Sequence, residues 1–357
     1  MTNSTIDQVS ENFAVEPTAA PPSRAELARP WLRFWLKIIA FMIFCMVIVG
    51  GATRLTNSGL SITEWQPIMG AIPPLNSAAW QAAFEKYQLS SQYKLQNQGM
   101  SLSDFQFIFW WEWSHRFLGR MIGVAFLPIL VMGLFGRLEK LQWPRMFALF
   151  VLLGLQGALG WYMVKSGLVD RVDVSQYRLA AHLTLAIIFF ASVLWTIFSI
   201  GKRHYFPHSL DQWAALFLML LVFTQVAAGG FVAGLNAGQG YNTWPLMDGQ
   251  WVPDGLNVMQ PAWRNIFENA LTVQFNHRMI AYFILILAVW HALRTFTLSG
   301  MLLVYAVLTQ ACIGILTLLL HVPIGVALIH QSAALLVVTA AVWNLHKKTK
   351  VAEVTKL

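Results

Sequence analysis

The sequence has few charged residues and almost no cysteine. Only 11% of its 357 residues are charged, whereas about a quarter are charged in a soluble domain. The 2 cysteines, Cys45 and Cys312, both lie in apolar runs, which excludes a disulfide framework and a cysteine-based zinc site. The net charge of +8 comes from basic residues spread between apolar runs, whereas nucleic-acid binding requires them clustered on one face. We therefore expect neither a soluble globule nor a nucleic-acid-binding protein.

Long apolar runs are what the sequence does contain. Hydrophobic residues make up 57% of the chain, and a bilayer-spanning helix needs about 20 consecutive residues of this kind. A helix suits the bilayer because it satisfies its backbone hydrogen bonds internally. Eight runs are found, at 34–53, 115–136, 146–165, 179–200, 212–234, 275–294, 299–320 and 323–344. The sequence therefore predicts an all-α integral membrane protein with eight transmembrane helices.

Basic residues indicate the orientation of these helices. They precede the first run and follow the second, fourth, sixth and eighth runs, so all lie on one side, which is the cytoplasm under the positive-inside rule. Both termini are then cytoplasmic, with a flexible tail over 1–30 and a second tail over 347–357. The long connections 55–110 and 235–274 are expected to face outward.

The sequence also contains an internal repeat. G-G-A-T-R-L-T-N-S-G at 50–59 resembles G-G-F-V-A-G-L-N-A-G at 229–238, and a His-Arg dipeptide recurs in both parts. Four spans return the chain to its starting side, so the halves share one orientation about an axis along the membrane normal. We expect two pseudo-symmetric four-helix bundles, an N-terminal half at 31–205 and a C-terminal half at 206–346.

Four of the nine histidines share one depth in the predicted bundles. They lie in the first third of the even-numbered spans, at His115, His182, His277 and His330. An ionisable residue within a span is costly and indicates function. A lone histidine of this kind is more often a packing residue, but two per bundle can supply both axial ligands of a haem. Small residues follow each by four positions and leave room for a flat macrocycle, at Gly119, Ala186, Ala281 and Ala334.

Other histidines and other metals fit less well. His321, in the turn before the last span, competes with His330. The histidines expected to be solvated at the cytoplasmic ends are His204, His208, His291 and His346. Zinc or copper requires three or four close ligands. Glutamines and glycines of the third and seventh spans are interpreted as contacts between helices, among them Gln156, Gly160, Gln310 and Gly314.

Glu112 distinguishes the two halves. It stands three residues before His115, whereas Gln274 takes that place before His277. One interpretation is a helix-start carboxylate favoured by the helix dipole, with Arg116 or Arg120 as its partner. The other is a carboxylate that takes part in a reaction in one half only. Basic partners for haem propionates are expected among four arginines, namely Arg54, Arg116, Arg264 and Arg278.

Several segments together resemble the haem A synthase family over about residues 31–345. They include G-G-A-T-R-L-T-N-S-G-L-S at 50–61, E-W-S-H-R-F-L-G-R at 112–120, M-V-K-S-G-L at 163–168, R-L-A-A-H-L at 178–183, A-G-L-N-A-G-Q-G-Y-N-T-W-P-L-M-D-G at 233–249 and N-H-R at 276–278. The resemblance is to the proteobacterial and mitochondrial branch, because the outer loops lack a cysteine pair. It implies an oxidoreductase of the bacterial inner membrane that oxidises a ring methyl of haem O to the formyl of haem A, which serves terminal oxidases.

Carried over by position, the resemblance assigns a role to each site residue. It implies that His277 and His330 ligate the iron of a permanent haem b, and that His115 and His182 face the substrate haem O. Glu112 matches the essential catalytic carboxylate, which would take a proton or position a water. Arg116 and Arg278 are the preferred propionate partners. Membrane lipid, an electron acceptor, the haem O synthase and further copies of the chain are its expected partners.

Two other functions remain as alternatives. A bis-histidine b-type cytochrome that carries electrons predicts two permanent haems in symmetric surroundings, and Glu112 has no counterpart in the second half. A secondary transporter or haem exporter predicts broken helices and polar groups at the bilayer midplane. The polar groups of this sequence are instead expected near the outer edge.

Overall fold

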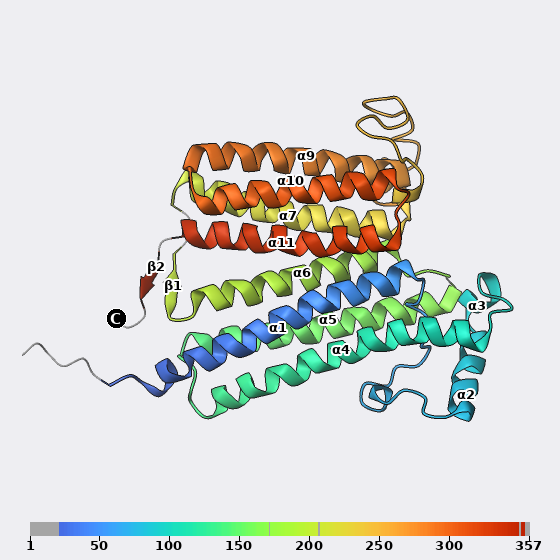
Figure 1. Ribbon diagram of the computed structural model, residues 1–357, viewed down its shortest axis with the longest axis horizontal. Coiled ribbons are helices and arrows are strands. Elements are labelled where there is room, and N and C mark those ends of the chain that lie inside the picture. Colours follow the sequence, from blue (N-terminus) through green and yellow to red (C-terminus); the bar gives the residue numbers. More distant parts are fainter. Residues whose placement is uncertain (1–20, 171, 206–207, 350, 354–357) are drawn as a thin grey trace, which may run out of the picture.

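The computed structural model describes residues 21–170, 172–205, 208–349 and 351–353, and nearly all of its regular structure is helical (Figure 1). Eight helices of this part are long and apolar enough to cross a membrane. They are α1 (Arg24–Leu55), α4 (Leu102–Leu134), α5 (Gln142–Asp170), α6 (Gln176–Ser199), α7 (Leu210–Gly234), α9 (Ala270–Thr295), α10 (Leu298–Leu319) and α11 (Ile324–Lys348). They confirm the predicted all-α membrane fold.

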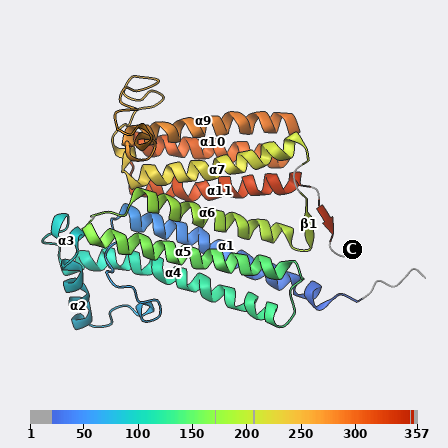
Figure 2. The same cartoon turned by 180° about the vertical axis from the view of Figure 1, so that it is seen from behind.

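The long helices form two groups of four. In the first, α1 contacts α4 and α6, and α5 contacts the same two helices. In the second, α7 and α10 each contact α9 and α11. The groups meet where α6 packs on α7 and α11 and where α1 packs on α11, and both views show them side by side (Figures 1 and 2).

The sequence repeat has one conformation in both groups. α1 ends at Leu55 and α7 ends at Gly234, and the aligned residues Asn57 and Asn236 follow with φ of 52° and 51°. Asparagine tolerates this left-handed conformation, which commonly ends helices. The repeat therefore marks equivalent helix ends on one side of the molecule.

The second glycine of each repeated Gly-Gly pair lies against the other group of helices. A Cβ added at Gly230 of α7 would lie 2.7 Å from Cα of Ala180 in α6. A Cβ at Gly51 of α1 would overlap the side chain of Gln331 in α11, whose Nε2 donates to the main-chain oxygen of Val47 at 3.0 Å. These glycines let the two bundles approach closely.

α4 begins much earlier than hydropathy predicts. Ser101 caps it in a reciprocal pair of hydrogen bonds with Asp104. Its first turns pack Phe105 and Phe109 against Phe84 and Tyr87 of α2 in an aromatic cluster. His115 is therefore the fourteenth residue of a 33-residue helix, and its predicted place in the first third of a helix is wrong. An extension stabilised by aromatic packing outside the apolar run gives no transmembrane signal.

Both long connections contain short helices and lie at one end of the bundles (Figure 1). The first holds η1 (Met69–Ala71), α2 (Ser77–Gln88) and α3 (Ser91–Leu95). The second holds η2 (Ala237–Gln239), η3 (Ala262–Arg264) and α8 (Asn265–Glu268). At the other end, β1 (Lys202–His204) pairs antiparallel with β2 (Val351–Glu353). This strand pair lies partly in the segment predicted to be a C-terminal tail.

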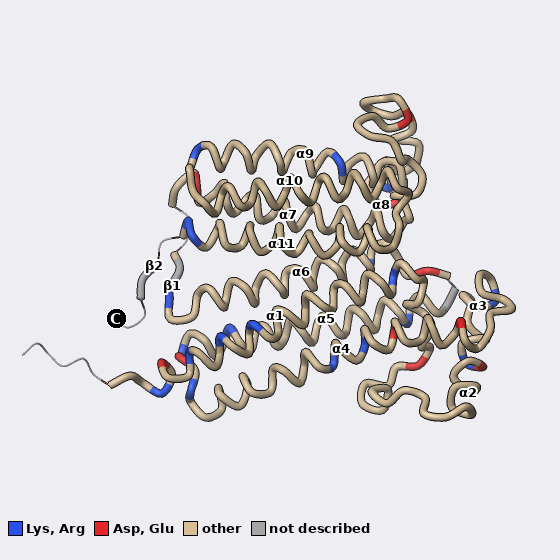
Figure 3. Tube along the Cα trace, viewed as in Figure 1, with Lys and Arg blue, Asp and Glu red and all other residues tan. Residues whose placement is uncertain are grey.

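Lysine and arginine positions are common at the end where α1 begins and α11 ends, whereas most aspartate and glutamate positions lie at the other end (Figure 3). Two ion pairs lie there: Arg29 of α1 pairs with Glu139 of the connection between α4 and α5 at 2.7 Å, and Arg294 of α9 pairs with Asp211 of α7 at 2.6 Å. α1 begins at Arg24, with Ser23 and Glu26 forming its capping box. The last part of the predicted N-terminal tail is therefore helical, and residues 1–20 lie outside the described part.

Candidate functional site

The four predicted histidines come from four different helices and form two couples, one in each bundle. His115 of α4 and His182 of α6 have ring centroids 6.5 Å apart. His277 of α9 and His330 of α11 lie close enough to interact electrostatically. The structure thus pairs the histidines in the way that the repeat predicts.

The first couple fits an iron between its rings. Metal–imidazole nitrogen bonds are about 2 Å long, so two rings on opposite sides of one iron have centroids roughly 6 Å apart. Nδ1 of His115, His182 and His277 is buried without a partner, and such unsatisfied nitrogen atoms are rare in folded proteins. No three His, Cys, Asp or Glu side chains of the described residues form a metal cluster. Paired imidazoles suit haem, because the macrocycle supplies the other ligands.

A glycine of a neighbouring helix lies against each of the four rings. A Cβ added to the glycine would come within 2.7–3.2 Å of Cε1 of the histidine. The four pairs are Gly50 with His115, Gly160 with His182, Gly229 with His277 and Gly314 with His330. A Cβ at any of these positions would press on the ring, so each glycine leaves the space that its histidine occupies. From the sequence, the glycines of α5 and α10 were expected only to pack helices together.

Three of the histidines also contact a glutamine. Nε2 of Gln225 donates to the main-chain oxygen of His277 at 3.1 Å and lies 3.2 Å from its ring Nε2. Gln156 makes the same two contacts with His182, at 3.1 and 3.2 Å. Gln310 lies 2.9 Å from the main-chain oxygen of His330 and 3.2 Å from its ring Nδ1. Each glutamine precedes its glycine by four residues, a pattern visible in the sequence but not used there.

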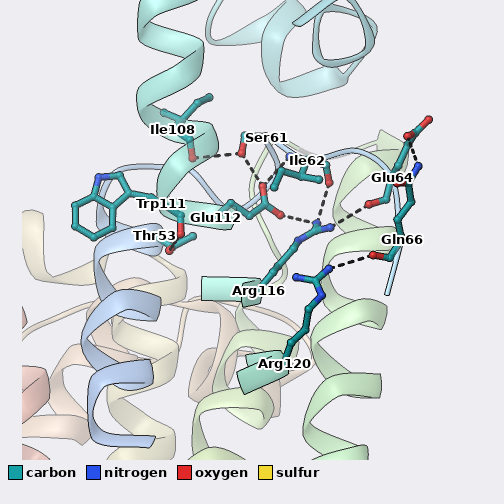
Figure 4. Close-up of polar contacts among 10 residues, drawn as sticks. All are labelled: Thr53, Ser61, Ile62, Glu64, Gln66, Ile108, Trp111, Glu112, Arg116 and Arg120. Atoms are coloured by element: carbon teal, nitrogen blue, oxygen red, sulfur yellow. Dashed lines mark hydrogen bonds and ion pairs between the residues drawn. The ribbon is translucent and has the colours of Figure 1, made fainter. Parts of the chain in front are cut away.

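Glu112 is buried in the first bundle, near the connection that follows α1 (Figure 4). Its Oε2 accepts hydrogen bonds from Ser61 Oγ at 2.7 Å and from the main-chain nitrogen of Ile62 at 2.8 Å. Its Oε1 accepts from Arg116 Nη2 at 2.6 Å. Glu112 is the eleventh residue of α4, so the interpretation as a helix-start carboxylate is wrong. The predicted pairing with Arg116 is present, whereas Arg120 donates to the main-chain oxygens of Gln66 and Pro67.

The second bundle has a neutral amide at the equivalent position. Nε2 of Gln274 donates to the main-chain oxygens of Ala237 at 2.9 Å and Tyr241 at 3.2 Å. Its Oε1 accepts from Arg278 Nη2 at 3.3 Å. Both halves therefore hold an arginine against the residue one helical turn before it, but only the first half places a carboxylate beside its histidines.

The sequence matches one known protein family over most of its length. A family model described as cytochrome oxidase assembly protein (COX15-CtaA) matches residues 33–342. Proteins named "Heme A synthase" are 51% identical over 340 residues in Azorhizobium caulinodans and 50% identical over 326 residues in Parvibaculum lavamentivorans. These alignments cover 92% and 89% of this chain, and 95% and 94% of the relatives. The chain belongs to the haem A synthase family.

In this family member, the arginines predicted to bind propionates make hydrogen bonds to the two long connections. Arg116 donates to the main-chain oxygens of Ile62 at 2.8 Å and Glu64 at 3.0 Å. Arg278 donates to Tyr241 and Thr243 in the same way, at 2.9 Å each. Arg54 donates to Oδ1 of Asn236, and Arg264 donates to Oε2 of Glu268. Their propionate role stays a prediction.

The remaining histidines do not all lie at solvated positions. His321 is exposed in the turn after α10 and His208 is exposed before α7. His291 is fully buried, with Nε2 3.1 Å from Nδ2 of Asn344, and His346 packs against the rings of Trp195 and Phe198. The predicted solvation of His291 and His346 is therefore wrong, because the ends of α9 and α11 pack within the bundle.

Proposed function

We propose that this protein oxidises a ring methyl group of haem O to the formyl group of haem A. The observation that carries the proposal is a histidine couple beside a buried carboxylate, present in one of two otherwise similar bundles. The family membership supports it, since the relatives are named for haem A synthesis. The reaction makes the protein an oxidoreductase.

The two bundles take different roles in this proposal. His115 and His182 receive the iron of the substrate haem O, and His277 and His330 ligate a resident haem b. A bound haem supplies one-electron transfer, which the removal of electrons from the methyl group requires. The fixed glutamine contacts of His277 and His330 favour a permanent group in the second bundle.

Glu112 handles the proton in the proposed reaction. Oxidation of a methyl group releases protons, and a positioned carboxylate can accept one or orient the attacking water. Ser61, Ile62 and Arg116 hold its two oxygens in place. Arg116 also balances the negative charge that burial would otherwise make costly. Gln274 cannot accept a proton in this way, so the chemistry is confined to the first bundle.

The protein lies in the inner membrane of a bacterium with both termini in the cytoplasm. The basic end of the bundles supports this orientation (Figure 3). Glu112 and the long connections then lie at the outer side, where Arg116 and Arg278 could also reach haem propionates. The electron acceptor and the haem O synthase are its proposed partners, and self-association is compatible with the fold. α5 and α10 run unbroken through Gln156 and Gln310, unlike the broken helices of transporters.

Pigment extraction tests the proposal. We expect protein purified from cells that make haem O to yield haem B together with haem O or haem A. The double variant His115→Ala/His182→Ala should keep haem B and lose the other two, and His277→Ala/His330→Ala should lose haem B. Chromatography of the extracted haems measures all three. Haem B alone, at two per wild-type chain, would contradict the proposal and support the electron carrier.

A further inference from the structure

Met46 interrupts a pattern that the other three histidine-contacting helices share. α5, α7 and α10 each carry a glutamine four residues before the glycine that touches a histidine ring. In α1 the glycine is Gly50, and the residue four before it is Met46. The sequence repeat aligns Gly50 with Gly229, so Met46 stands where the second bundle has Gln225.

The glutamine links the ring of its histidine to the backbone. In each case one amide nitrogen contacts both the main-chain oxygen and a ring nitrogen of the same residue. Oε1 of Gln156, Gln225 and Gln310 is buried without a partner, and Nδ1 of His182 and His277 is too. A metal-bound imidazole donates the hydrogen of its second ring nitrogen to an acceptor, which fixes its orientation and tautomer. Oε1 of each glutamine has no other partner and can accept this hydrogen once the amide turns over.

Met46 cannot supply a comparable acceptor. A thioether sulfur accepts hydrogen bonds only weakly. Its Cε lies 3.5 Å from where a Cβ at Gly119 would be, so the side chain fills space beside α4. Nδ1 of His115 is buried without a partner, and no described side chain holds its ring by a hydrogen bond. Methionine is also flexible and yields to a moving neighbour.

We propose that Gln156, Gln225 and Gln310 are positioning residues that fix three imidazoles, and that Met46 leaves His115 free to move off the iron of the substrate haem. The open coordination position then lies on the His115 side. Glu112 lies on that side too, because it precedes His115 by three residues on the same helix. This inference rests on the proposed function.

The two differences between the bundles therefore concern one histidine. The first bundle has Glu112 and Met46 near His115, and the second has Gln274 and Gln225 near His277. A resident haem stays bound through two held ligands, whereas a substrate haem must enter and leave its site. The exchange of a glutamine for a methionine gives the first bundle one ligand that can release the iron.

Carbon monoxide binding to the reduced protein tests the inference, because carbon monoxide binds iron only where an axial position is open. We expect wild-type protein loaded with haem O to bind carbon monoxide in the first bundle. Met46→Gln should lower the bound fraction about fivefold or more, as one added hydrogen bond allows. Met46→Leu, which has no acceptor for the ring N–H, should bind as wild type does. The reciprocal change Gln225→Met should let haem b bind carbon monoxide.

Single histidine variants provide a second, independent test. His115→Ala should retain haem O through His182, whereas His182→Ala should lose most of it. If the Met46→Gln protein does not accumulate in cells, the comparison of His115→Ala with His182→Ala still tests the inference. Equal loss of haem O from both single variants, or unchanged carbon monoxide binding in Met46→Gln with normal haem content, would overturn the inference alone. Absence of haem O and haem A from wild-type extracts would instead overturn the proposed function.

Discussion

The two bundles share one scaffold and differ in a few side chains around their histidines. Each has two histidines against two glycines, and an arginine that bonds to the long connection at the same end of the bundle. Near His277 the second bundle has two neutral amides, Gln225 and Gln274, which donate to main-chain oxygens, and Gln274 also accepts from Arg278. In the first, a carboxylate and a thioether replace those amides. A repeated scaffold can thus hold a static site and a reactive site.

The carboxylate of Glu112 is tolerated in the interior of the first bundle because three donors satisfy its oxygens. These donors come from Arg116 on the same helix and from the connection after α1, so the position of the carboxylate depends on that connection.

Glu112→Gln should have the largest effect, because it gives the first bundle the amide of the second. We expect haem A formation to fall about 100-fold or more, as the loss of a general base implies. Haem O should accumulate and haem B should stay bound, which extraction and chromatography measure. Glu268→Gln is the matched control, since Glu268 is a carboxylate paired with an arginine four residues away. Normal haem A yield from Glu112→Gln would refute its proposed role.

Arg116→Gln should destabilise the protein more than Arg278→Gln does. Both variants lose hydrogen bonds to loop carbonyls. The first also removes a charged partner from the buried Glu112 carboxylate, and hydrogen bonds to charged groups contribute about 2 kcal/mol. Thermal unfolding in detergent measures the difference. Adding Glu112→Gln to Arg116→Gln should recover part of the loss, and identical midpoints for the two single variants would contradict this account.

Gly314→Ala should reduce haem B content about tenfold, as changes in the contacts around a metal ligand commonly do. The new Cβ would lie 2.7 Å from Cε1 of His330. Gly325→Ala is the control on α11, since nothing lies within 4 Å of its Cβ position. Gly50→Ala should affect only haem O. The haem content of the purified variants distinguishes these outcomes, and loss of both haems from either variant would count against independent sites.

Arg264→Gln should have the smallest effect. Arg264 and Glu268 have the same i,i+4 spacing as Glu112 and Arg116, but they lie in an exposed connection, where ion pairs contribute little. Hydrogen bonds from Arg264 and Tyr177 lower the pKa of Glu268 from 4.5. The pair therefore stabilises the fold above pH 4.5, and this contribution is lost as the pH falls through the lowered pKa. Unfolding midpoints at pH 7 and pH 4 should show a small effect at pH 7 and a smaller one at pH 4.

Much of the site follows from residue type and spacing. Eight apolar runs, the repeated Gly-Gly segment and four histidines at related places are all properties of the linear chain. The contrast between Glu112 and Gln274 is visible in the same way. The start of α4 could not be predicted from the sequence, because its first turns are stabilised by aromatic contacts with α2. The burial of His291 could not be predicted either, because it depends on Asn344 of another helix.

The sequence by itself determined the membrane class, the repeat and the candidate ligands, because hydropathy and residue spacing act along one chain. Only the tertiary structure decided which side chain meets which ring. Gln225 contacts His277 across 52 positions of sequence and Gln156 contacts His182 across 26. Such contacts depend on the rotation and depth of packed helices, and many rotations satisfy one apolar pattern. That Met46 occupies the position taken by a glutamine in the other three helices can be recognised only once those rotations are known.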